Sequence, residues 1–259
     1  GSEMCIRDRY VDTDFWNDFR NAVNAARPET YLVAEVMGDS RLWLQGDRFD
    51  ATMNYTFRDL CKDYFASGTV DTAAFLDGYT RMHAMYSPAV AAVNLNLLSS
   101  HDTSRFLTVA GGDRQSLLLA TLFQMTVPGA PSVYYGDEIG MLGGEDPDCR
   151  RAFPREIPED AAGLLADFRA LMRMRRDEAA LREGGWELGH VAGEAFVYRR
   201  ISGPDVIAVA INMSDASVQL PLGASSASQQ MWGQGTATNE GDEAWIRDLP
   251  ARNGAVVRL

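Results

Sequence analysis

The sequence predicts an α/β fold made of parallel βαβ units, followed by a small all-β domain. Two observations support this prediction. Over residues 13–183, short apolar runs alternate with longer segments in which apolar residues recur at helical spacing. After Gly184-Gly185 the pattern changes to short alternating runs separated by turn signals such as Gly203-Pro204 and Asn253-Gly254. That second pattern is typical of a β-sandwich.

Four strands and five helices are predicted in the first part. Each predicted strand is a short apolar run that ends in polar residues, and the strands cover residues 31–35, 49–55, 93–102 and 131–138. The predicted helices lie at residues 13–27, around 57–65, 75–86 and 117–125, and at about 161–183. Four strand–helix units are half of the number that closes a (β/α)8 barrel.

Composition excludes several classes of function. The chain has 24 basic and 36 acidic residues and a formal net charge of −12, which disfavours a nucleic-acid partner. No apolar run approaches the roughly 20 residues of a membrane span.

The cysteines Cys5, Cys61 and Cys149 are widely separated, so neither a disulfide framework nor a metal site is indicated. The acidic stretch "EDPD" lacks EF-hand spacing. We therefore expect no metal or cofactor, and a cytoplasmic location rather than secretion.

Polar residues follow the predicted strands at their C-terminal ends: Glu35, Asn54, His101-Asp102 and Gly136-Asp137-Glu138. In parallel α/β folds this edge of the sheet is where ligands bind. Glycoside hydrolysis needs one carboxyl group that donates a proton and another that stays ionised. Glu35 and Asp102, delivered by different strands, are therefore the candidate catalytic residues.

Three segments also resemble a known family. They read "YLVAEVMGDSRLWLQGDRFDATMNY", "NLLSSHDTSRF" and "GAPSVYYGDEIGMLGGEDPDCRRAFP", and they are similar to the second half of α-amylase superfamily enzymes (glycoside hydrolase family 13). The nearest subgroup contains the neopullulanases, cyclomaltodextrinases and maltogenic amylases. The resemblance implies that residues 10–183 form the C-terminal half of a (β/α)8 catalytic barrel and residues 184–259 a β-sandwich.

The resemblance also implies an activity and roles for individual residues. The activity is retaining cleavage of α-1,4 glucosidic bonds, with α-1,6 as a second candidate linkage, in maltodextrins, cyclodextrins or pullulan. Glu35 would be the general acid/base, and Asp102 the carboxylate that steadies the reacting sugar. His101 would hydrogen-bond that sugar, and Asp146 and Arg150 would grip the donor-side glucose. The alternative for Asp146 and Arg150 is a surface salt bridge.

On the acceptor side, the resemblance places Asn54 and Tyr55. The family usually has an aromatic residue directly after the acid, whereas this chain has Val36. Trp43 could stack on sugar or pack in the interior. Calcium occurs in the family, but no site for it is identified here. Members of the subgroup often form homodimers, so a homodimer is a candidate state of the full-length protein.

The nucleophile of the family is an Asp in a Gly-x-Arg-x-Asp stretch upstream of the acid. The matching region here reads "EMCIRDRYV", where Asp8 follows no apolar run and no such stretch. We therefore predict that residues 1–9 are a foreign or artefactual segment and that the chain lacks the nucleophile. On this interpretation the chain alone hydrolyses little. The alternative is a catalytically silent α-glucan-binding protein derived from such an enzyme.

Overall fold

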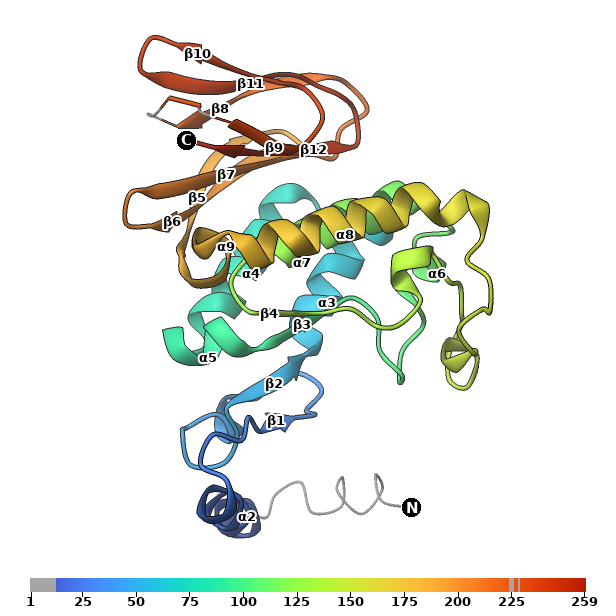
Figure 1. The fold of residues 1–259 in the computed structure, drawn as a ribbon, viewed down its shortest axis with the longest axis vertical. Helices are drawn as coiled ribbons and strands as arrows, with labels where there is room; N and C mark the ends of the chain where they lie inside the picture. Colours follow the sequence, from blue (N-terminus) through green and yellow to red (C-terminus); the bar gives the residue numbers. More distant parts are fainter. Residues whose placement is uncertain (1–12, 224–225, 228) are drawn as a thin grey trace.

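The computed structural model describes residues 13–223, 226–227 and 229–259 (Figure 1). The segment predicted to be foreign, residues 1–9, lies outside this part of the chain, as does Asp8. A region of parallel strands and helices comes first, and antiparallel sheets follow it along the long axis of the molecule. No helix in the described residues is both long enough and apolar enough to span a bilayer.

The first region contains a four-stranded parallel sheet, as predicted. Its strands are β1 (Val33–Ala34), β2 (Ala51–Asn54), β3 (Leu95–Leu97) and β4 (Ala130–Ser132), arranged in the order β1-β2-β3-β4. All three pairings are parallel. Most of the strands are shorter than predicted at both ends, since residues 31–32, 49–50 and 93–94 precede the paired segments. After the strands, polar residues such as Glu35, His101 and Asp102 lie in loops. Since the strands run the same way, these loops gather at one edge of the sheet.

Helices connect and flank these strands along the chain. They are α2 (Thr13–Ala26), α3 (Tyr55–Cys61), which continues as the π-helical turn η2 (Lys62–Ala66), α4 (Thr72–Ala84), α5 (Pro88–Val93), α6 (Phe106–Val109), α7 (Arg114–Thr126), α8 (Ala162–Asp177) and α9 (Ala179–Glu183), with short 3-10 turns η1 (Arg41–Trp43), η3 (Asp137–Ile139), η4 (Asp148–Arg150) and η5 (Glu159–Ala161). The short helices α5 and α6 were not predicted. The helix predicted over 161–183 is divided at Glu178, whose backbone is extended.

The second region is the predicted β-sandwich. One sheet has the order β5-β6-β7-β12-β9 and the other β10-β11-β8. The strands are β5 (Gly185–Ala192), β6 (Ala195–Ser202), β7 (Asp205–Asn212), β8 (Val218–Gly223), β9 (Gln229–Gly233), β10 (Thr236–Glu240), β11 (Glu243–Leu249) and β12 (Asn253–Arg258). Buried residues from both sheets, among them Val197, Ala210, Leu220 and Ile246, form the core between them.

The two regions share a second apolar core. Phe75 of α4 and Phe123 of α7 pack with Phe196 and Tyr198 of β6, and all four side chains are buried. The rings of Phe75 and Phe123 lie 5.1 Å apart, and those of Phe123 and Tyr198 lie 5.7 Å apart, which is favourable for aromatic pairs. The β-sandwich therefore supports the helices that position the sheet.

A buried arginine strengthens this junction. The carbonyl groups in the last turn of α7 have no partner within the helix, and Arg200 of β6 donates to one of them, the oxygen of Thr126. Its other nitrogens donate to the oxygens of Gly184 and Gly185. Arg175 of α8 supplies further donors to the end of α7, at Met125 and Val127. Burial lowers the pKa of both arginines to about 10, so both keep their charge at neutral pH.

We expect Arg200→Leu to lower the free energy of unfolding by about 2–4 kcal/mol, because buried carbonyl groups lose their donors. Urea unfolding followed by circular dichroism measures this difference. The neighbouring Arg199 pairs with Glu187 at a partly exposed position, so Arg199→Leu is the matched control and should change stability by no more than about 1 kcal/mol. Equal effects of the two substitutions would contradict the role given to Arg200.

Candidate active site

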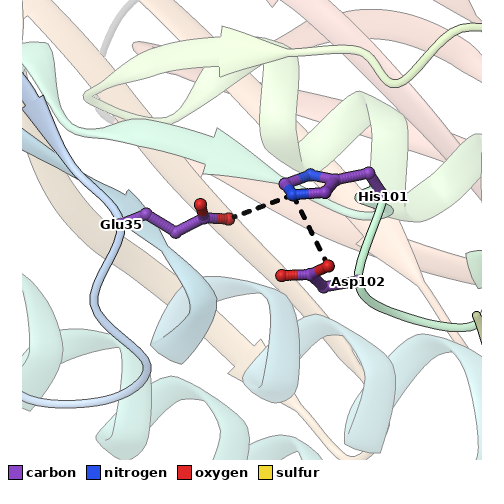
Figure 2. Close-up of side chains that lie close together, drawn as sticks. All are labelled: Glu35, His101 and Asp102. Atoms are coloured by element: carbon purple, nitrogen blue, oxygen red, sulfur yellow. Dashed lines mark ion pairs between the residues drawn. The ribbon is translucent and has the colours of Figure 1, made fainter. Parts of the chain in front are cut away.

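Three polar side chains meet at the C-terminal edge of the parallel sheet (Figure 2). Glu35 follows β1 directly, while His101 and Asp102 lie in the loop after β3. The Nε2 atom of His101 is 3.7 Å from Oε1 of Glu35 and 3.5 Å from Oδ1 of Asp102. The side chains of Glu35, His101 and Asp102 are 40%, 32% and 17% exposed. The predicted convergence of Glu35, His101 and Asp102 is thus present, in a position open to a ligand.

Tyr55 holds the carboxylate of Glu35. It follows β2, and its hydroxyl oxygen lies 3.1 Å from Oε1 of Glu35 and 3.2 Å from Oγ of Ser100. Burial raises the pKa of Tyr55 to about 12, and the nearby Glu35 also raises it, so the hydroxyl stays protonated and can donate. Tyr55 was predicted on the acceptor side, but its contact with Glu35 was not predicted from the sequence.

Arg150 and Asp146 lie beside Asp102. The Nη2 atom of Arg150 donates to Oδ1 of Asp102 over 3.0 Å, and Nε lies 2.8 Å from Oδ1 of Asp146. Nε also donates to the backbone oxygen of His101. Arg150 therefore connects the loop after β3 with the loop after β4. A guanidinium with several donors is suited to holding a carboxylate and sugar hydroxyl groups together.

A buried arginine behind the cluster fixes both loops. Arg105 is fully buried, and its Nη1 atom donates to Oδ1 of Asp137 over 3.1 Å and to the oxygen of Tyr135. Its Nε atom donates to the oxygen of Cys149, whose thiol in turn donates to the oxygen of His101. Burial raises the pKa of Asp137 to about 7, although the guanidinium of Arg105 opposes this.

Arg105 was missed in the sequence interpretation. In the sequence, Arg105 stands directly before the apolar residues Phe106 and Leu107, which are expected to be buried. An arginine next to a buried pair was the available signal. Its partner Asp137 lies in another loop, and sequence spacing gives no information about which groups pair across loops. The sequence motifs therefore could not predict that Arg105 holds the two loops of the site together.

Asn54 and Trp43 lie in the interior. Asn54 is 3% exposed; its Oδ1 accepts from the backbone NH of Phe57 at the start of α3, and its Nδ2 donates to Asn96. The amide predicted to line the acceptor side is thus used within the protein. Trp43, for which sugar stacking and packing were both open, is 3% exposed and packs in a cluster with Val36.

The cluster of Glu35, His101 and Asp102 can perform acid–base chemistry on a bound ligand. A carboxyl group that is held by a hydroxyl donor and reaches solvent can pass a proton to a leaving oxygen. A second carboxylate at the same edge of the sheet, here Asp102, can stabilise the positive charge that develops on a sugar ring. The imidazole between them can donate a hydrogen bond to a ligand hydroxyl.

Comparison with known proteins identifies similar chains. A family model described as the alpha amylase catalytic domain matches residues 2–227. A cyclomaltodextrinase from Geobacillus thermopakistaniensis is 37% identical over 216 residues, which cover 82% of this chain and 36% of the relative. Neopullulanase 2 from Thermoactinomyces vulgaris is 43% identical over 188 residues, with coverage of 73% and 32%. The chain thus spans about a third of the length of these relatives.

Solved structures of related enzymes are also similar to this chain. A debranching enzyme from Nostoc punctiforme superposes with a TM-score of 0.87 and 33% identity over 95% of this chain and 55% of that one. A cyclic α-maltosyl-(1→6)-maltose hydrolase from Arthrobacter globiformis, in complex with cyclic α-maltosyl-(1→6)-maltose, gives a TM-score of 0.80 and 30% identity, with coverage of 96% and 54%. Each matched protein is larger than this chain, so the described parallel sheet corresponds to part of a larger catalytic domain.

Proposed function

Because this chain belongs to the α-amylase family of glycoside hydrolases, family 13, and is similar to its cyclomaltodextrinases and neopullulanases, we propose that its polar cluster serves a retaining hydrolase of α-1,4-linked glucans. The observation that carries this proposal is the meeting of Glu35, His101 and Asp102 at one edge of a parallel sheet. Two carboxyl groups from separate loops, with an imidazole between them, are suited to glycosidic bond cleavage.

In the proposed reaction Glu35 donates its proton to the glycosidic oxygen while a nucleophilic carboxylate attacks the anomeric carbon. The bond to the leaving sugar breaks, and a glycosyl ester forms. Glu35, now ionised, removes a proton from water, which attacks the same carbon and releases the nucleophile. Asp102 steadies the positively charged sugar, and His101 donates to one of its hydroxyl groups. Arg150, held by Asp102 and Asp146, positions the donor-side glucose.

The nucleophile is assigned to sequence outside these 259 residues. No Gly-x-Arg-x-Asp stretch precedes Glu35 in this chain, and the relatives are about three times as long as the aligned part. A retaining mechanism needs the nucleophile and the acid about 5–5.5 Å apart. We therefore propose that this chain contributes the acid and the sugar-stabilising groups, and that hydrolysis needs a further segment carrying the attacking Asp.

The substrate proposed is a maltodextrin, a cyclodextrin or pullulan. The names of the similar enzymes point to these α-glucans, and a solved relative holds a cyclic α-maltosyl oligosaccharide. The Arg150–Asp146 pair, 40% and 51% exposed, offers donors and acceptors to glucose hydroxyl groups. Cleavage of α-1,6 bonds is a finer proposal. Pullulan contains both α-1,4 and α-1,6 linkages, so the identity of the oligosaccharides released from it would test which bonds are cleaved.

The test compares the 259-residue chain with a protein extended upstream to include a Gly-x-Arg-x-Asp stretch. Both are assayed on cyclodextrin, starch and pullulan by release of reducing sugar. We expect turnover by the extended protein and at most trace activity from the chain alone. An extended protein that binds these glucans without cleaving them would contradict hydrolysis and favour the silent binding protein. Equal activity of both proteins would contradict the assignment of the nucleophile.

A further inference from the structure

The atoms that meet at the polar cluster also have the arrangement of metal ligands. One atom each of Glu35, His101 and Asp102 can be chosen so that all three lie within 4.8 Å of one another. Two of the separations are 3.7 and 3.5 Å, both measured from Nε2 of His101. A tetrahedral ion with bonds of about 2.1 Å needs its ligands about 3.4 Å apart. Both separations from Nε2 are within about 0.3 Å of this value, and the carboxylate of Glu35, at 40% exposure, is the most exposed of the three and has the most room to adjust.

We propose that Glu35, His101 and Asp102 form a binding site for a divalent first-row transition ion of the zinc type. An imidazole nitrogen with two carboxylate oxygens is a ligand set that zinc and its neighbours accept, and a fourth position remains open to water. Calcium is not expected, because it takes six to eight oxygen ligands and these three side chains offer too few. The ligands come from distant positions in the sequence, so their spacing gave no metal motif.

Contacts around the three ligands support the site and also limit its affinity. The hydroxyl of Tyr55 donates to Oε1 of Glu35, the oxygen that faces His101, and so orients this carboxylate toward the site. Arg150, in contrast, donates to Oδ1 of Asp102 and brings a positive charge close to the ion. Arg150 can release Asp102 and keep its bonds to Asp146 and to the oxygen of His101. The site therefore accepts an ion at an electrostatic cost.

A bound ion should prevent catalysis. It would hold the carboxylate that donates the proton and the carboxylate that steadies the sugar, so that glucan and ion exclude each other. This consequence depends on the proposed function, whereas the metal site itself does not. Metal binding is therefore measured directly and without sugar, so that its failure and the failure of the proposed function can be told apart.

The experiment titrates the 259-residue chain with Co²⁺ and follows its d–d absorption, with Zn²⁺ and Ca²⁺ as competitors. One equivalent should bind with the spectrum of nitrogen and oxygen coordination, and Zn²⁺ but not Ca²⁺ should displace it. Loss of an outer-shell partner lowers metal affinity by about 10- to 100-fold, so loss of the ligand in His101→Gln should exceed that range. Glu35→Gln should weaken binding as well, and Arg150→Ala should strengthen it several-fold.

The chain contains matched controls. It has three histidines, and the other two, His83 and His190, lie outside the cluster, so His83→Gln and His190→Gln should bind Co²⁺ as the unmodified chain does. Circular dichroism without metal checks that each variant is folded. The proposal is overturned if His101→Gln retains the signal, if Arg150→Ala weakens binding, or if thiolate-to-cobalt charge-transfer bands show that cysteines hold the ion.

Discussion

Replacement of Glu35 by Gln is expected to lower kcat of the extended, nucleophile-containing protein on maltodextrins by about 10²- to 10⁴-fold, the usual contribution of a general acid or base. Glutamine keeps the size of the side chain and can still accept from Tyr55, but it has no proton to give to the glycosidic oxygen. Binding should therefore survive, and the loss should appear in kcat rather than in KM. Initial rates of reducing-sugar release measure both constants.

The leaving group gives a sharper test of this role. In a maltosyl fluoride the leaving group is the fluoride ion, which departs without a proton from an acid. The first step in Glu35→Gln should therefore be far less impaired on this substrate than on a maltodextrin. Glu29, an exposed carboxylate before the other end of β1, provides the control Glu29→Gln, which should leave kcat unchanged. Because Glu35 also serves the second step, the comparison uses kcat/KM, which reports the steps up to formation of the glycosyl ester. Equal losses of kcat/KM on both substrates, or no loss on either, would rule out Glu35 as the proton donor.

The second large effect concerns Asp137, and it should appear as a dependence of stability on pH. Burial raises the pKa of its carboxyl group to about 7 in the folded protein, while the ordinary value in an unfolded chain is about 3.9. The folded state therefore binds this proton more tightly. The resulting stabilisation is complete below about pH 4 and is lost as the pH rises to about 7, at about 1.4 kcal/mol per pH unit.

Urea unfolding at pH 4, 5.5 and 7 measures this linkage, which amounts to about 4 kcal/mol over the whole window. Other groups titrate in the same range, so the quantity of interest is the difference between the unmodified chain and Asp137→Asn. The unmodified chain should lose stability relative to the variant as the pH rises. Asp160→Asn, at an exposed position, is the control and should follow the unmodified chain. A parallel profile for Asp137→Asn would contradict the prediction.

Much of the candidate site could be predicted from the sequence because it follows from the direction of the strands. Glu35 and the His101-Asp102 pair each come after an apolar run, and parallel strands bring their C-terminal ends to one edge. The change to alternating apolar and polar residues after Gly184-Gly185 likewise predicted the β-sandwich, because this period-two pattern can be recognised within a short stretch of sequence. Strand lengths were predicted less well, because residues on either side of the short paired segments, apolar as well as polar, lie outside the sheet.

The amino-acid sequence by itself determined the order of the strands and longer helices, the parallel sheet, the sandwich and the carboxylates at the C-terminal edge of the sheet. These depend on local periodicity and on which residues end each strand. Only the tertiary structure decided which groups meet: Arg105 with Asp137, Tyr55 with Glu35, and Arg200 with the end of α7. Such pairs form because buried polar groups must find partners across the fold. Nothing in the local sequence identifies those partners, because they are brought together by packing.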